Sequence, residues 1–302
     1  MNALKKQKIT PFLWFDNNAE EAIRFYTSIF PNSRINLLKN WPEGGPFPTN
    51  TIHSGSFVLD GIQLQAFDAG PQFKFNPSIS FFVVCETENE INALWDKLIE
   101  GGEAMMPLDR YEWSERYGWL TDRFGISWQL MKGNPEDVGQ KIVPLLFFTG
   151  AQRGKAEEAI NLYMSVFKDS ALDGILKYTP GEIDANGGMV KHAQCKLMGQ
   201  TYMFMDSGVD NDFPFNEAIS IFVSCDGQEE VDYYWKKFTE EGAQEQQCGW
   251  LKDRFGVSWQ IAPHSLMDRV ADGEPKRVLN MMNALYKMKK LDVAALEKAY
   301  NQ

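Results

Sequence analysis

The chain has 302 residues, of which 44% are hydrophobic and 13% aromatic, so it is long enough for about two domains with apolar cores. Its 41 acidic and 30 basic residues give a net charge of -11, which disfavours nucleic acid and anionic membranes as partners. Residues 1–10 lack the apolar core of a signal peptide, and the longest apolar stretches, 79–85 and 142–148, are too short to span a bilayer. We expect a globular, cytoplasmic protein.

The four cysteines show no CxxC spacing, and two of them fall at matched positions within apolar runs that we interpret as buried strands. These matched residues are Cys85 and Cys225, and the other two are Cys195 and Cys248. We expect reduced thiols in the core rather than disulfides or a metal site.

The first half of the chain contains two units with the same order of expected elements, strand, helix and three strands. Ala22, Ile23 and Tyr26 share one face of the first helix, and Gly101-Gly102 ends the second. The first unit comprises a strand at 9–15, a helix at 19–30 and strands at 34–40, 51–59 and 62–67. The second comprises a strand at 79–85, a helix at 88–99 and strands near 104–107, 117–121 and 126–131.

The second half repeats this plan. Ala156-Glu-Glu-Ala-Ile with Tyr163 answers Ala19-Glu-Glu-Ala-Ile with Tyr26, and Trp235 answers Trp95. The duplication predicts an α+β fold of four βαβββ modules, arranged as two domains at residues 8–135 and 140–265. After them, apolar residues at near-helical spacing predict a helical tail over residues 275–300.

The clearest repeat is GWLTDRFGISWQL at residues 118–130, which returns as GWLKDRFGVSWQI at residues 249–261. In each copy an apolar strand leads to an Asp-Arg-Phe-Gly turn and a second strand, so we expect the same β-hairpin twice. The alternation of the second strand places Ser127 and Gln129, and likewise Ser258 and Gln260, on one face. These polar faces point either to solvent or into a cavity.

These motifs carry a resemblance to a known family. Pro11-Phe-Leu-Trp-Phe, Ala19-Glu-Glu-Ala, both hairpins and the Met288-Lys-Lys-Leu-Asp of the tail are similar to the PhnB-like group, whose domain is labelled 3-demethylubiquinone-9 3-methyltransferase. That group belongs to the vicinal-oxygen-chelate superfamily of glyoxalases, extradiol dioxygenases and bleomycin- and fosfomycin-resistance proteins. The resemblance implies βαβββ modules whose sheets curl around a cavity. It also implies an intramolecular pseudo-dimer, and a further homodimer stays open.

In this superfamily a divalent metal is normally held by His or Gln on one module's first strand, His on another's, and Glu on a last strand. Carried over, the first ligand falls at Thr10 or Pro11 and at Val143 or Pro144, the second at Ser78 and Ala218, and the third at Gln129 and Gln260. Neutral amides supply none of the charge that holds a dication, and His53, His192 and His264 are not spaced as ligand pairs. We expect no bound catalytic metal and no cofactor.

The residues do not support a methyltransferase mechanism. Binding of S-adenosylmethionine usually uses a glycine-rich strand-to-helix turn in a parallel α/β sheet, and the βαβββ pattern indicates a different fold. Gly44-Gly45-Pro46 and Gly187-Gly188 lie in expected loops.

The remaining candidates are ligand-binding side chains, each with a structural alternative. Ser127, Gln129, Ser258 and Gln260 either contact a ligand or make plain structural hydrogen bonds. Asp68 and Asp206 end matched strands and favour turn caps over catalytic bases, and Asp122 and Asp253 favour stabilisation of the hairpin turns. Trp119 and Trp250, like Trp128 and Trp259, either wall a pocket or belong to the core.

Two functional hypotheses follow. The first is a binding protein whose metal-free, aromatic cavity takes a small organic molecule. The second is an enzyme, either a metal-dependent lyase or dioxygenase of the superfamily type or the methyltransferase that the label names. The absence of the metal-binding residue types favours the first.

Overall fold

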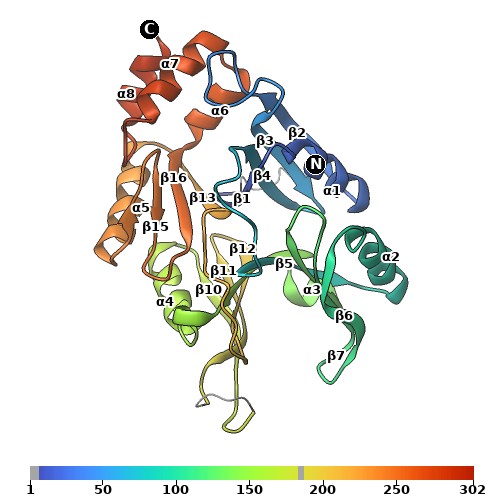
Figure 1. The fold of residues 1–302 in the computed structure, drawn as a ribbon. Helices are drawn as coiled ribbons and strands as arrows, with labels where there is room; N and C mark the ends of the chain where they lie inside the picture. Colours follow the sequence, from blue (N-terminus) through green and yellow to red (C-terminus); the bar gives the residue numbers. More distant parts are fainter. Residues whose placement is uncertain (1–6, 183–186) are drawn as a thin grey trace.

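The computed structural model describes residues 7–182 and 187–302, and Figure 1 shows their arrangement. Within this part of the chain the strands form two eight-stranded sheets. We call the sheet of order β14-β15-β16-β13-β1-β4-β3-β2 sheet A, and the sheet of order β10-β11-β12-β9-β5-β8-β7-β6 sheet B. Each module therefore contributes four adjacent strands to one sheet, and the predicted α+β fold of four βαβββ modules is confirmed.

The elements of the first half agree closely with the expected ranges. They are β1 (Ile9–Phe15), α1 (Ala19–Ile29), β2 (Arg34–Asn40), β3 (Ile52–Leu59), β4 (Ile62–Asp68), β5 (Ile79–Cys85), α2 (Glu88–Leu98), β6 (Glu103–Tyr111), β7 (Ser114–Thr121) and β8 (Ser127–Lys132). A short helix that we did not expect, α3 (Pro135–Val138), follows them, with the Asn134 side chain accepting from the Glu136 N–H at its start.

The second half and the tail continue the same order. The elements are β9 (Ile142–Phe148), η1 (Gly150–Gln152), α4 (Ala156–Val166), β10 (Ala171–Lys177), β11 (Val190–Leu197), β12 (Gln200–Asp206), β13 (Ile219–Cys225), α5 (Gln228–Glu240), β14 (Gln244–Glu245), β15 (Trp250–Lys252), β16 (Ser258–Pro263), α6 (His264–Asp272), α7 (Pro275–Leu285) and α8 (Val293–Tyr300).

The two sequence halves are joined by strand pairing at the centre of each sheet. Strand β1 pairs antiparallel with β13, with Phe12 opposite Ser220, and β5 pairs antiparallel with β9, with Ser80 opposite Leu145. Central strands are covered on both faces, which explains why β5 and β9 consist of uninterrupted buried residues whereas the edge strand β10 is largely exposed. Each half thus supplies four strands to each sheet, as in a dimer built within one chain.

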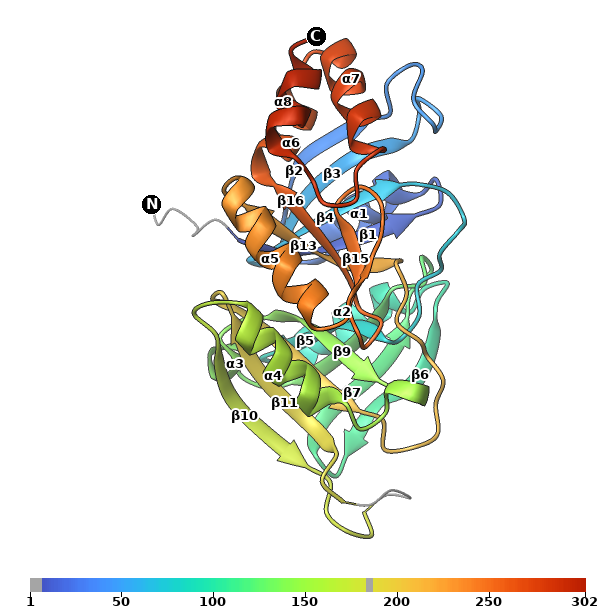
Figure 2. The ribbon, with the colours of Figure 1, turned by 90° about the vertical axis from the view of Figure 1, so that its left-hand side faces the viewer.

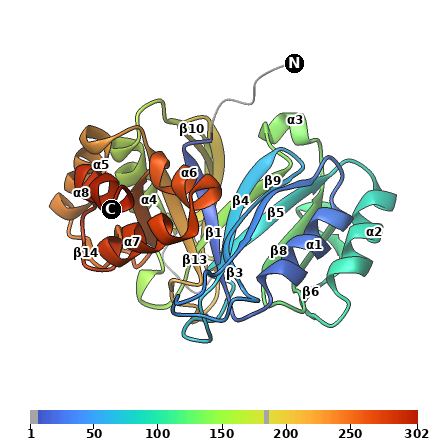
Figure 3. The same cartoon turned by 90° about the horizontal axis from the view of Figure 1, so that it is seen from above.

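The helices lie on one face of each sheet and form a core within each half. Figure 3 shows α1 and α2 on one side of the molecule and α4 and α5 on the other. In the first half the Trp128 ring packs against Phe30 of the segment after α1 and Phe81 of β5, with centroid distances of 5.3 and 5.2 Å. The opposite face of each sheet carries none of these four helices, and we call it the helix-free face.

The predicted C-terminal helical tail is present and begins earlier than expected, at His264, because α6 follows β16 without a loop. Figure 2 shows α6 to α8 gathered at one end of sheet A. The Lys39 side chain of β2 donates to the Ala271 carbonyl at 3.1 Å, and the Cys248 N–H donates to the Met288 carbonyl at 2.7 Å. The tail therefore connects the two opposite edges of sheet A. No helix in the described ranges combines the length and apolar character that crossing a bilayer requires.

Candidate functional site

Both sheets curl toward their helix-free faces. Strands β1 and β15 are separated by two strands, which places them roughly 14 Å apart in a flat sheet. Their side chains Trp14 and Trp250 nevertheless lie with ring centroids only 6.2 Å apart. In sheet B, two strands likewise separate β7 from β9, yet the ring centroids of Trp119 on β7 and Phe147 on β9 are only 5.5 Å apart. The helix-free faces are therefore concave, as the superfamily resemblance implies.

The predicted polar residues of sheet B lie on this concave face and are satisfied by their neighbours. Tyr117 Oη donates to Gln129 Oε1 at 2.8 Å, and Gln129 Nε2 donates to Ser80 Oγ at 3.0 Å. Trp119 Nε1 donates to Ser127 Oγ at 2.8 Å. Because both ends of the Gln129 amide are engaged and Gln129 and Ser127 are buried, these two residues have structural partners already.

The matched residues of sheet A keep only part of this pattern. Gln260 Nε2 donates to Ser220 Oγ at 2.9 Å, but Cys248 stands where the first half has Tyr117, so no hydroxyl reaches Gln260 Oε1. Ser258 is fully buried, yet its Oγ has no partner among the described residues, and Trp250 Nε1 makes no bond to it. The hydrogen-bonding capacity that sheet B uses internally is thus left open in sheet A.

Two further unpartnered acceptors lie on the same face and were not predicted from the sequence. Gln65 Oε1 on β4 and Ser54 Oγ on β3 are buried without a partner in the described part of the chain. Strand register places Gln65 opposite Phe12, and Phe12 opposite Ser220, so these residues form one row across sheet A. The alternation of Gln63, Gln65 and Phe67 along β4 was the only signal in the sequence that could have identified Gln65.

Sheet B carries Met203 where sheet A carries Gln65, and His192 where sheet A carries Ser54. Met203 of β12 lies opposite Leu145 in the register that Gln65 has with Phe12. Seven residues of the concave face of sheet B form a separate hydrophobic cluster, made of Phe82, Val84, Tyr117, Val143, Leu145, Phe147 and Met203. His192, which lies beside Phe82 at 6.4 Å, is half-buried there, and burial lowers its pKa. Sheet B is therefore filled by its own side chains.

Asp68 and Asp206 accept hydrogen bonds from backbone N–H groups at matched positions of the two halves. The Asp68 carboxylate accepts from the Ala19 N–H at the start of α1 at 3.0 Å and from the Ile52 N–H at the start of β3 at 2.7 Å. Asp206 accepts in the same way from the Ala156 N–H, at 3.2 Å, and from the Val190 N–H, at 2.8 Å. Burial raises the pKa of both carboxyls, against the opposing effect of these donors. This geometry gives them a helix-capping role.

Asp122 has a larger role than the turn role that its motif predicts. Besides the Phe124 and Ile126 N–H groups of the turn, it accepts from Tyr26 Oη at 2.7 Å and from Trp128 Nε1 at 2.8 Å. The second half repeats the network. There Asp253 accepts from Tyr163 Oη at 2.7 Å, from Trp259 Nε1 at 2.9 Å and from the Phe255 and Val257 N–H groups.

Trp128 and Trp259 are 1% and 0% exposed, so they belong to the core of the helix side and not to a ligand site. Trp119 and Trp250, by contrast, are only partly buried and point to the concave faces. Sequence reasoning missed the Tyr–Asp–Trp connection, although the matched Tyr26 and Tyr163 within the repeated helix motif signalled it.

The residues at the superfamily's metal positions do not fit a divalent cation. In sheet A, Thr10, Phe222 and Gln260 lie in one row and Phe12, Ser220 and Gln65 in the next. In sheet B the rows contain Val143, Phe82 and Gln129, and then Leu145, Ser80 and Met203. None of these side chains is anionic or an imidazole, and no group of three or more His, Cys, Asp or Glu in the described ranges is arranged as a metal site.

Comparisons with known proteins agree with this architecture. Protein YjdN of Escherichia coli (strain K12) is 26% identical over 136 residues, which cover 40% of this chain and 92% of that protein. A Bacillus cereus structure described as a putative 3-demethylubiquinone-9 3-methyltransferase, PhnB protein, is 42% identical, covers 42% of this chain and 100% of that chain, and has a TM-score of 0.41. Glyoxalase I from Zea mays is 11% identical, with 88% of this chain and 98% of that chain covered and a TM-score of 0.55, so it shares the fold.

The family described as 3-demethylubiquinone-9 3-methyltransferase matches residues 7–131 and again residues 140–262. These two matches cover most of the chain and coincide with the duplicated halves. The chain therefore belongs to this PhnB-like family of glyoxalase-fold proteins, of which it carries two tandem copies.

Proposed function

We propose that this protein binds a small organic molecule on the concave face of sheet A. The proposal rests on three buried polar atoms of that face, Ser54 Oγ, Gln65 Oε1 and Ser258 Oγ, to which the described residues offer no hydrogen-bond partner. A buried polar group that lacks a hydrogen bond costs roughly 1–3 kcal/mol, so several on one face indicate that another molecule supplies the partners.

The chemistry of the face defines the class of ligand. Phe12, Phe67 and Phe222 pack around the open acceptors, and Trp14 and Trp250 stand at their side. Gln65 Oε1 accepts only, and the serine hydroxyls accept or donate, so the ligand needs hydroxyl or N–H donors. The charged pair beside this row, Lys252 and Glu217 at 2.9 Å, is already neutralised. A neutral aromatic compound with hydroxyl groups fits these requirements.

Sheet B provides the contrast within the same molecule. The acceptors of Gln129 and Ser127 are paired internally, and a hydrophobic cluster occupies much of the rest of its concave face. The duplication has therefore produced one sheet with unpaired polar groups on its concave face, sheet A, and one sheet whose Gln129 and Ser127 acceptors are paired, sheet B. We assign ligand binding to sheet A and a structural role to sheet B.

The test screens neutral phenols, catechols and quinols by thermal shift and confirms the hits by isothermal titration calorimetry. The key variant is Gln65→Met, which copies the residue that sheet B has at the matched position, and the control is Met203→Leu in sheet B. We expect Gln65→Met to abolish binding of the hits and to raise the free energy of unfolding by about 1 kcal/mol, because an unpaired acceptor is removed.

The control should leave hit affinity unchanged. Hits that bind equally to both variants, or that lose affinity only in Met203→Leu, would place the ligand elsewhere and contradict the assignment. A Gln65→Met variant that is destabilised would show that the Gln65 amide already has a hydrogen-bond partner. The proposal would then lose the unpaired acceptor on which it rests.

A further inference from the structure

A second candidate site lies outside the concave face of sheet A, beside the β6–β7 hairpin of the first half. An open hollow of about 540 Å³ is found there between the hairpin, the end of β8 and the start of α3. Its lining residues are Glu86, Trp113, Ser114, Glu115, Met131, Lys132, Gly133 and Asn134.

The duplication does not account for this hollow. Residue 118 follows residue 85 by 33 positions, whereas the matched residue 249 follows residue 225 by 24, so the first half has nine additional residues here. They lengthen the strands to β6 (Glu103–Tyr111) and β7 (Ser114–Thr121), where the second half has only the short β14 and β15. Figure 1 shows this hairpin extending away from the body of sheet B.

The additional residues build an aromatic surface that is open to solvent. Trp113 stacks on Tyr111 with ring centroids 5.0 Å apart and an interplanar angle of 24°, and Tyr117 meets both rings edge to face. Trp113 is 58% exposed, the highest exposure of any tryptophan in the described chain. A large aromatic ring that is fixed in position and exposed at the edge of a hollow is a common feature of ligand sites.

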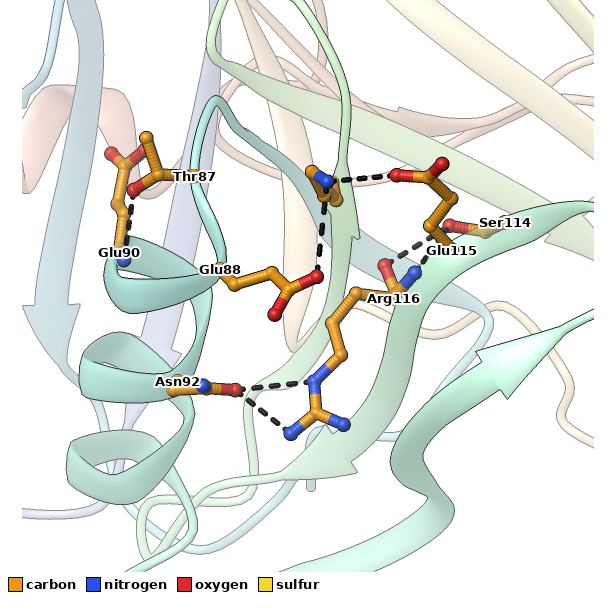
Figure 4. A network of polar contacts seen from close by, with 8 residues as sticks. Thr87, Glu88, Glu90, Asn92, Ser114, Glu115 and Arg116 are labelled. Carbon is orange, nitrogen blue, oxygen red and sulfur yellow. Dashed lines mark hydrogen bonds and ion pairs between the residues drawn. The ribbon is translucent and has the colours of Figure 1, made fainter.

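The charges around the hollow select against an anion. Lys132 Nζ is the positive group of the lining, and it lies 2.7 Å from Glu115 Oε2 and 3.8 Å from Glu88 Oε1. Figure 4 shows these two carboxylates approaching from β7 and from α2, and Arg116 turned away toward Asn92, to whose Oδ1 it donates. An incoming anion would therefore find each nearby cation engaged.

The remaining charge at the hollow is negative. Glu86 is exposed, and its side chain makes no ion pair or hydrogen bond with the described residues. A carboxylate without an ion pair and an exposed tryptophan that line the same hollow provide the two elements that recognise an organic ammonium ion, an ion pair and a cation–π contact. Met131 adds apolar surface for the remainder of such a ligand.

From this geometry we infer that the hollow beside the β6–β7 hairpin binds organic ammonium ions that carry a flat apolar group. The cation lies between Trp113 and the Glu86 carboxylate, and the apolar group rests against Met131. This site is independent of sheet A, since none of its lining residues belongs to that sheet.

The probe is benzyltrimethylammonium, with benzyl alcohol as the neutral comparison, added to full-length protein labelled with ¹⁵N-tryptophan. The indole signal of Trp113 is assigned as the one that disappears in Trp113→Phe. We expect benzyltrimethylammonium to shift this signal with saturation, and Glu86→Gln to weaken the affinity roughly fivefold, which is the size of one exposed charge contact. Glu229→Gln, an exposed change of equal charge in the second half, should leave the affinity unchanged.

Equal shifts with benzyl alcohol would overturn the inference, because they would show that charge is not recognised. An unchanged affinity in Glu86→Gln, or a saturable shift confined to a different indole, would do the same. Gln65→Met in sheet A should not alter this binding, so failure here is distinguishable from failure of the proposed function.

Discussion

Replacing Asp122 by Asn tests whether an ionised carboxylate organises the core of each half. Asp122 is buried and accepts four hydrogen bonds, from Tyr26 Oη, Trp128 Nε1 and two backbone N–H groups. The Trp and backbone groups can only donate, so the ionised form matches its surroundings. An Asn side chain keeps one oxygen for the turn but presents its NH₂ to Trp128.

The cost follows from the bonds that change. A hydrogen bond to a charged group contributes about 1.5–3 kcal/mol, and an unpaired buried donor costs about 1–3 kcal/mol. Release of the buried charge offsets part of this loss, because burial raises the pKa of the Asp122 carboxyl. We expect Asp122→Asn to lower the free energy of unfolding by about 3 kcal/mol.

The assay is guanidinium unfolding at pH 7.5, followed by near-ultraviolet circular dichroism. Tyr26→Phe removes a single donor and should cost about 1.5 kcal/mol, and Asp253→Asn in the second half provides an internal replicate. If Asp122→Asn changes stability by less than about 0.5 kcal/mol, the carboxyl is protonated in the fold and the ionised network does not exist.

Three further predictions follow. Trp128→Ala and Trp259→Ala should each cost about 3–5 kcal/mol in chemical unfolding, because both rings are fully buried, and a loss below 2 kcal/mol would contradict their core position. Burial lowers the pKa of His53 to about 4, below its unfolded value of 6.5, so stability should fall by about 2 kcal/mol from pH 7.5 to pH 5, and His53→Phe should reduce this fall. Gln129→Glu and Gln260→Glu should lose stability without binding Ni²⁺ or Mn²⁺ at micromolar concentration in calorimetry, since the neighbouring strands place no imidazole or carboxylate directly opposite either residue.

The fold was largely predictable because local signals and the duplication agree. The hairpin at Asp122 to Gly125 forms as its motif predicts, and Gly125 has a φ of +87°, which glycine adopts without strain. Central and edge strands could not be ordered from the sequence, since the β1–β13 and β5–β9 pairs join residues 59 or more positions apart. Strand order within a sheet depends on such long-range packing, which local periodicity does not encode.

The candidate site was predicted only in part. The alternation rule placed Gln129 and Gln260 on the correct faces, but it could not show that Tyr117 satisfies the first and that Cys248 leaves the second open. Gln65 was missed because its importance arises from the lack of a partner, and a lack of partners is visible only when the surrounding strands are in place. The aromatic stack at Trp113 has no counterpart in the repeat, so comparison of the halves could not reveal it.

The most direct test of the account is a crystal structure of the protein with a hit from the neutral aromatic screen, at a resolution that shows ordered water. We predict the ligand on the concave face of sheet A, with its donors within hydrogen-bonding distance of Gln65 Oε1 and Ser258 Oγ and its ring among the aromatic side chains. A ligand seated on sheet B, or ordered waters that satisfy the open atoms of sheet A while the ligand lies elsewhere, would contradict it.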